Sequence, residues 1–194
     1  MRSLFNRIEK VERSRRPRSC RLAVSVDGLE RRELLTGGSV IGAGSIVEVF
    51  PGSTGPNTTV VSYQMHNGAT MLDVNLNGGD NFFSASQVTT LYYLGYAASG
   101  SQMFQDSTAL NVTAMGGSGS NTFEAGSGSD TFYGGSGSNT FDAGTGFDIM
   151  VGGSSTNVYN ENANGYGIIE ETGGLDTVNS PDGSFGGGYM VLLV

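Results

Sequence analysis

The most informative absence in this 194-residue chain is that of cationic side chains after residue 37. All ten Lys and Arg lie in residues 1–37, whereas 13 of the 18 Asp and Glu lie beyond them. The two parts therefore carry net charges of +5 and −13. A carboxylate that leaves water needs a compensating group, and in residues 38–194 that group has to be a divalent cation or a basic partner. Nucleic acid is not expected as a partner, because proteins contact its phosphates chiefly through Lys and Arg.

Cysteine and long apolar runs are also scarce. The only cysteine, Cys20, lies in the basic part, so residues 38–194 contain no thiol and no disulfide. No apolar run reaches the 18 residues of a membrane span, and the apolar ending, residues 189–194, is long enough only for a strand. We therefore expect no membrane span.

Catalytic residue types are few. His66 is the only histidine and precedes Asn67 and Gly68, which is typical of a surface turn. Glu170 and Glu171 could in principle form a glycosidase pair, but neighbours on a strand point to opposite faces. We predict that the protein is not an enzyme, and a polysaccharide-acting β-helix is the weakest alternative.

Residues 1–37 are expected to be a leader outside the fold, disordered or helical. The Arg-rich stretch 15–18 is followed by Leu29-Glu30-Arg31-Arg32-Glu33-Leu34-Leu35-Thr36. This sequence resembles the N-terminal motif of planctomycete extracellular proteins, which ends in a pattern like LExRxLLS, with Thr36 in place of the usual Ser. The resemblance implies export to the cell surface or beyond. A basic amphipathic helix that binds a membrane or a partner is the alternative.

Glycine is abundant where the cations are missing, with 30 glycines in residues 38–194. Short β-prone runs separated by Gly, Asn, Ser and Pro fill residues 38–115. In residues 70–76 apolar and polar residues alternate, as in a strand with one buried face. Leu72-Asp73-Val74 before Gly78 and Leu110-Asn111-Val112 before Gly116 look alike. We therefore predict irregular β-solenoid coils over residues 38–115.

A nine-residue repeat runs from Gly116 to Asn160. Its five units read GGSGSNTFE, AGSGSDTFY, GGSGSNTFD, AGTGFDIMV and GGSSTNVYN. The glycines permit backbone conformations that a Cβ would penalise. The eighth place is always large and apolar and is the predicted core: Phe123, Phe132, Phe141, Met150 and Tyr159.

The repeat resembles the RTX, or haemolysin-type, calcium-binding nonapeptide GGxGxDxUx. The resemblance implies a parallel β-roll in which two units make one 18-residue coil, so that units n and n+2 stack on the same side. It also implies Ca²⁺ between coils, held by carboxylates of the sixth place and by backbone carbonyls of the glycine turns.

The residue at the sixth place differs between alternate units. In such a roll, alternate units lie on opposite edges, so the Asp and the Asn residues lie on different edges. Asp130 and Asp148 stack on one edge, where we predict one calcium site with the turn residues Gly126, Gly128, Ala143, Gly144 and Gly146. The other edge carries Asn121, Asn139 and Asn157. These are expected to form a neutral ladder of hydrogen-bonded amides or to bind calcium more weakly.

Several further residues are candidates of lower rank. Glu124 and Asp142, at the ninth place, are expected on a solvated outer face, with a weak second ion as the alternative. Ser155 replaces a glycine, so the last unit is expected to fray or to cap the array. Residues 161–194 are expected to be a degenerate flank with a closing strand, and Asp176 a peripheral ligand at most.

The sequence thus predicts an all-β protein with a leader (1–37), irregular coils (38–115), a parallel β-roll (116–160) and a flank (161–194). We expect an exported, non-catalytic, calcium-binding module with a structural or surface-interaction role. Cell-surface or extracellular matrix components are the candidate partners. The alternative is a metal-independent, adhesive Asn-ladder solenoid that exposes a modest apolar strip of Tyr133, Ile149 and Val151.

Overall fold

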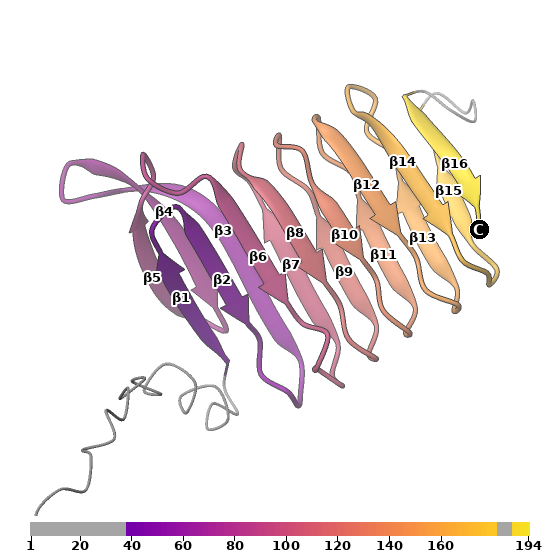
Figure 1. The fold of residues 1–194 in the computed structure, drawn as a ribbon, viewed down its shortest axis with the longest axis horizontal. Coiled ribbons are helices and arrows are strands. Elements are labelled where there is room, and N and C mark those ends of the chain that lie inside the picture. The colour runs from indigo at the N-terminus through magenta and orange to yellow at the C-terminus, as the bar shows by residue number, and fades with distance from the viewer. Residues whose placement is uncertain (1–37, 182–187) are drawn as a thin grey trace, which may run out of the picture. The chain divides into compact units, whose positions relative to one another are not determined.

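A computed structural model describes residues 38–181 and 188–194, and these form a β-solenoid without any helix in the described part. The chain passes from one sheet to the other and back, so successive coils lie side by side (Figure 1). The all-β, parallel solenoid predicted from the sequence is confirmed. The predicted leader, residues 1–37, lies outside the described residues. Among the described residues there is no helix with the length and apolar character needed to cross a membrane.

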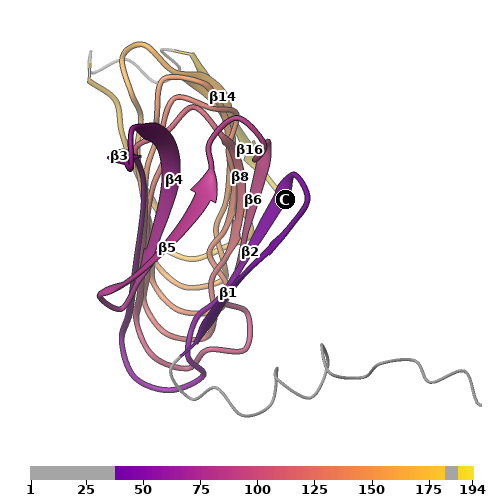
Figure 2. The same cartoon turned by 90° about the vertical axis from the view of Figure 1, so that its left-hand side faces the viewer.

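Two eight-stranded sheets face each other across the solenoid (Figure 2). The first sheet has the order β1 (Ser39–Ala43), β2 (Ile46–Phe50), β6 (Thr90–Leu94), β8 (Asn111–Met115), β10 (Thr131–Tyr133), β12 (Phe147–Val151), β14 (Tyr166–Glu171) and β16 (Tyr189–Leu193). The second has the order β15 (Thr177–Asn179), β13 (Asn157–Asn160), β11 (Asn139–Asp142), β9 (Asn121–Glu124), β7 (Gln102–Asp106), β3 (Asn57–His66), β4 (Ala69–Leu76) and β5 (Gly79–Ser84). From β2 to β16 every strand that continues the coil pairs in parallel with the strand of the next coil.

The repeat sets an 18-residue pitch. Asn139 of β11 is in register with Asn121 and with Asn157, and Phe132 of β10 is in register with Met150 of β12. Odd units therefore supply the second sheet and even units the first. Two nonapeptides make one coil, as the resemblance implied.

Residues 66–84 depart from the expected irregular coils. β3 and β4 pair antiparallel, and so do β4 and β5. Each pair is joined by a two-residue Asn-Gly turn with positive φ at both positions, 51° and 80° at Asn67 and Gly68 and 54° and 85° at Asn77 and Gly78. Positive φ at both central residues is the geometry of a type I′ hairpin. The stretch around Leu72 is thus a hairpin strand, and only the similar stretch at β8 belongs to a coil.

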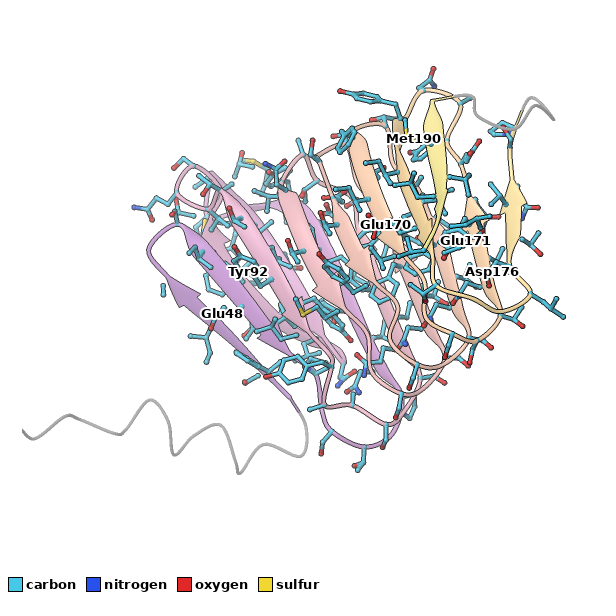
Figure 3. All side chains as sticks on the ribbon, turned by 45° about the vertical axis from the view of Figure 1, so that its right-hand side comes forward. Glu48, Tyr92, Glu170, Glu171, Asp176 and Met190 are labelled. Carbon is cyan, nitrogen blue, oxygen red and sulfur yellow. The ribbon has the colours of Figure 1, made fainter. Side chains whose placement is uncertain are left out.

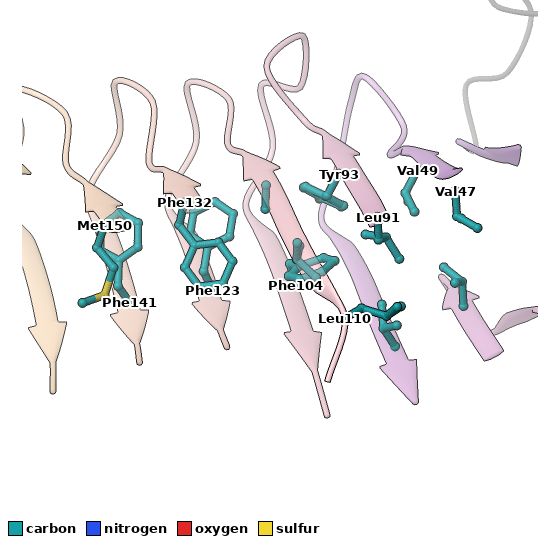
Figure 4. Packing of buried hydrophobic residues seen from close by; sticks show 14 of the residues in the cluster. Val47, Val49, Leu91, Tyr93, Phe104, Leu110, Phe123, Phe132, Phe141 and Met150 are labelled. Carbon is teal, nitrogen blue, oxygen red and sulfur yellow. The ribbon is translucent and has the colours of Figure 1, made fainter. Parts of the chain in front are cut away.

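The core is a row of apolar side chains that runs between the two sheets (Figure 4). In the second sheet the rings of Phe123 and Phe141 stack with centroids 5.5 Å apart, and those of Phe141 and Tyr159 with centroids 5.0 Å apart. Phe132 of the first sheet stacks on Phe123 at 5.3 Å. These four side chains and Met150 are completely buried. The eighth place of the repeat therefore fills the interior, because alternate residues of each strand point inward.

Candidate metal centre

The turns between the sheets form two rows that we call corners. The Asp corner consists of the turns from the second sheet to the first, residues 107–110, 125–130, 143–146 and 161–165, and of the strand ends beside these turns or in register with them. The Asn corner consists of the opposite turns, residues 95–101, 116–120, 134–138, 152–156 and 172–176, and of the strand ends beside them. Each corner stacks its turns coil upon coil, so a residue type that recurs every 18 residues forms a column.

The Asn corner contains a continuous ladder of amides. Asn121 Nδ2 donates to Asn139 Oδ1 at 2.8 Å, and Asn139 Nδ2 donates to Asn157 Oδ1 at 2.9 Å. Asn157 Nδ2 donates in turn to Asp176 Oδ1 at 3.1 Å, and the Asn157 amide donates to the same oxygen at 2.7 Å. All three Asn side chains are at most 2% exposed. Asp176 is therefore the terminal acceptor of the ladder.

The same column continues toward the N-terminus beyond the repeats. Asn57 is in register with Gln102, and Gln102 with Asn121. Asn57 Nδ2 donates to the carbonyls of Gly52 and Gly55, as Asn157 Nδ2 does to those of Gly153 and Ser155. Gln102 accepts a hydrogen bond from the Tyr93 hydroxyl. Asn57 and Gln102 were not expected, although a glycine lies five residues before Asn57 and two before Gln102.

Side-chain amide hydrogens satisfy the inward carbonyls of the Asn corner. Asn121 Nδ2 donates to the carbonyls of Gly119 and Gly134, both at 2.8 Å, and Asn139 Nδ2 donates to Gly137 O at 2.7 Å. These carbonyls therefore already accept hydrogen bonds from side-chain amides.

The Asp corner uses the opposite polarity. Asp148 Oδ1 accepts from the Asp130 amide at 3.2 Å, and Asp148 Oδ2 accepts from the Gly144 amide at 3.0 Å. Asp130 Oδ1 accepts from the Val112 amide at 2.9 Å, one coil earlier. The two carboxylates therefore occupy equivalent positions in adjacent coils, and they are 1% and 0% exposed.

The charge of these carboxylates is poorly compensated. The pKa of Asp130 is raised to about 7, chiefly by burial and to a lesser extent by the neighbouring charges of Asp148 and Asp106, against hydrogen bonds from the Val112 and Gly126 amides that lower it. Burial also raises the pKa of Asp148, against hydrogen bonds from the amides of Asp130 and Gly144 and from the Tyr189 hydroxyl. Asp130 Oδ2 is buried and has no hydrogen-bond partner.

These turns coincide with a known repeat. Residues 115–158 match the RTX calcium-binding nonapeptide repeat in four copies. The segment is thus similar to RTX repeats over about a quarter of the chain. Comparison of the chain with the curated proteins and with the solved structures gave no match.

Two observations indicate that the turns of the Asp corner fit a calcium ion. The unpartnered Asp130 Oδ2 offers a charged ligand oxygen, and Ca²⁺ takes six to eight oxygen ligands including backbone carbonyls. The turns also stack so closely that a Cβ on Gly144 would overlap the Gly126 carbonyl, and one on Gly146 the Gly128 carbonyl. Ala143 lies beside them at the first place of its unit. In the described part of the chain no three Asp, Glu, His or Cys side chains converge, so an ion here would depend on two carboxylates and on backbone oxygens.

The ninth-place acids lie on the outer face of the second sheet. Glu124 and Asp142 are in register on β9 and β11. Asp142 Oδ1 accepts from Asn160 Nδ2, and Asn160 Oδ1 accepts from Asn179 Nδ2 at 2.7 Å. Asp142 is thus part of an outer row of side-chain hydrogen bonds.

The last repeat unit does not fray. β13 pairs with β11 on one side and with β15 on the other, and Ser155 Oγ donates to Ser136 O at 2.9 Å. The solenoid continues through β16, so the last unit, which was expected to fray or to cap the array, does neither. The coil after it is built from non-repeat sequence that keeps the same register.

Three Asp-corner residues were missed in the sequence. Asp106 and Glu161 are 4% and 7% exposed, and Tyr189 donates from its hydroxyl to Asp148 Oδ2 at 3.3 Å across 41 residues of sequence. Gly167 stands in register between Asp148 and Tyr189, and a Cβ on Gly165 would lie 2.6 Å from the Tyr189 hydroxyl oxygen. No local signal marks these residues, because only the coil register brings them to the corner.

The residues weighed for catalysis or contact lie elsewhere. His66 ends β3 and stacks on Phe82 with centroids 4.6 Å apart. Glu170 and Glu171 lie on β14 (Figure 3), and Glu170 is in register with the outward-facing Val151. Burial and the charge of Asp176 raise the pKa of Glu171. The expected apolar strip of Tyr133, Ile149 and Val151 lies on the outer face of the first sheet. Tyr133 is 43% exposed, and Ile149 and Val151 are half-buried.

Proposed function

We propose that this protein is an exported, non-catalytic β-roll module in which Ca²⁺ bridges the stacked coils of the Asp corner. The observation that carries the proposal is the buried pair Asp130 and Asp148 in adjacent RTX coils, with Asp130 Oδ2 unpartnered. The described residues contain no Lys or Arg to neutralise the pair. A hard divalent cation with oxygen ligands supplies that charge.

The expected role of the ion is structural. Two unit charges about 5 Å apart, the spacing of adjacent strands, repel by about 3 kcal/mol at an effective dielectric constant near 20. An ion between the coils removes this repulsion and adds attraction to both carboxylates. Calcium is therefore expected to tighten the stacking of the roll and to make its stability depend on the calcium concentration.

Calcium titration by calorimetry, combined with thermal melts, tests the proposal. Calcium at about 100 times its dissociation constant stabilises the folded state by about 2.7 kcal/mol. In a domain of this size that shifts Tm upward by roughly 5–10 °C relative to chelator. Asp130→Asn is expected to abolish both the heat of binding and the shift, whereas Asp142→Asn, on the outer face, is expected to retain them. A wild-type protein with the same Tm in calcium and in chelator would refute the proposal.

The Asn ladder supports a second candidate, a metal-independent structural or adhesive solenoid. The unbroken chain of hydrogen bonds from Asn121 to Asp176 stabilises the roll without an ion. Circular dichroism in chelator distinguishes the two candidates. A folded, calcium-insensitive β spectrum favours the ladder alone, and a spectrum that changes with calcium favours the bridged roll.

Export is supported by the leader motif and by the RTX repeats, which are typical of secreted proteins. Deletion of residues 1–37, followed by measurement of the protein in cells and medium, tests it. Cell-surface or extracellular matrix components remain the proposed partners.

A further inference from the structure

The Asp corner contains a buried carboxylate that precedes the RTX repeats. Asp106 ends β7, nine residues before the RTX match begins at residue 115, and is 4% exposed. Gln105 is in register with Glu124, so Asp106 takes the place that Ala125 has in the next coil. Burial raises the pKa of Asp106, and hydrogen bonds from Thr108 and Ser107 only partly oppose it. The coil of Asp106 lacks the glycine turn of the repeat and reads Asp-Ser-Thr-Ala-Leu.

The two oxygens of Asp106 have different environments. Oδ1 accepts from the Thr108 amide at 2.9 Å, and this bond holds the carboxylate in the turn. Oδ2 is buried without a hydrogen-bond partner. It faces the next coil, since a Cβ on Gly126 would lie 2.6 Å from it. The free oxygen therefore faces Gly126, in the turn of residues 125–130 of the next coil.

Asp130 ends the same turn of residues 125–130. Its Oδ1 accepts from the amide of Val112, which belongs to the coil of Asp106. Its Oδ2 is also buried and unpartnered. Two acids that interact through their charges thus each present a free oxygen, and no ammonium or guanidinium lies among the described residues to pair with them.

We propose that Asp106 and Asp130 bind a second divalent cation, one coil before the Asp130–Asp148 site. Asp130 is then shared, with an ion on each side of its coil. This inference rests on the proposed function for the ion's identity, but it takes its second carboxylate from a turn outside the repeat and at a different place of the coil. The site extends calcium-dependent order from the RTX repeats into the preceding coil.

The stoichiometry of calcium binding to the full chain, measured by calorimetry, tests the proposal. The wild-type protein is expected to bind two ions. Asp106→Asn keeps the oxygen that accepts from Thr108 and is expected to bind one ion, as is Asp148→Asn, because each variant leaves one site complete. Asp130→Asn is expected to bind none. The matched control, Asp142→Asn, is expected to bind two.

The outcomes separate the two proposals. One ion in the wild-type protein, lost in Asp130→Asn, would leave the proposed function standing and overturn the second site. No binding at all would overturn both. Two ions in Asp106→Asn would place the second ion elsewhere, for example at Glu161, and would also overturn it. If Asp106→Asn does not fold, hydrogen exchange of the wild-type protein decides: the second equivalent of calcium must slow exchange in residues 107–110, and unchanged exchange there overturns the proposal.

Discussion

Replacement of Asn139 by alanine tests whether the amide ladder stabilises the roll. Asn139 lies at the centre of the ladder and is 2% exposed. Its side chain accepts from Asn121 Nδ2 and donates to Asn157 Oδ1 and to Gly137 O. Asn139→Ala removes all three hydrogen bonds at once.

The expected loss follows from which groups are left without partners. Asn121 Nδ2 still donates to the carbonyls of Gly119 and Gly134, so this donor remains satisfied. Asn157 Oδ1 and Gly137 O each lose a donor. An acceptor orphaned on burial costs about 1–3 kcal/mol, and Gly137 is only partly buried. The free energy of unfolding is therefore expected to fall by about 2–5 kcal/mol, a large part of the 5–15 kcal/mol typical of a domain.

Urea denaturation followed by circular dichroism measures this loss. The matched control is Thr140→Ala, on the same strand but on its outer face, where a change of about 0.5 kcal/mol is expected. Because the ladder contains no ion, the loss in Asn139→Ala should be the same in calcium and in chelator. If Asn139→Ala and Thr140→Ala destabilise the protein equally, the ladder does not stabilise the fold and the reasoning is refuted.

Two further predictions concern the acids and the core. In chelator the free energy of unfolding should fall as the pH rises from about 4 to 8, since the pKa of buried Asp130 is raised from 3.8 to about 7 and the folded state binds the extra proton. This change in the free energy of unfolding should be on the order of a few kcal/mol, and calcium should reverse it by favouring the ionised carboxylates. Thermal melts at pH 5 and pH 8 check the sign of the change. A chelated protein that is more stable at pH 8 than at pH 5 would contradict the prediction. Phe141→Ala should cost about 3–5 kcal/mol, because the ring is fully buried between Phe123 and Tyr159. Urea denaturation checks this value, and a loss below about 1 kcal/mol would mean that the stacked rings are not the core.

Much of the repeat region is predictable because its pattern is local and periodic. The eighth-place residues such as Phe132 and Met150 alternate with outward residues, and alternation alone sends them inward. The alternation of Asn and Asp at the sixth place assigns Asn139 and Asp148 to opposite corners once the 18-residue pitch is adopted. The Asn-Gly dipeptides at residues 67–68 and 77–78 also carried a hairpin signal, but the likeness of the following strand to the coil at β8 obscured it.

By itself the sequence determined the repeat period, the inward and outward faces of the strands, and the separation of carboxylates from amides on opposite corners. Each of these features depends on residues that recur every nine or eighteen positions. Only the tertiary structure decided which non-repeat residues join the corners. Asp106, Glu161 and Tyr189 reach the Asp corner because parallel pairing fixes their coils in register with the repeats. Their positions follow from inter-coil hydrogen bonding over tens of residues, which no local pattern encodes.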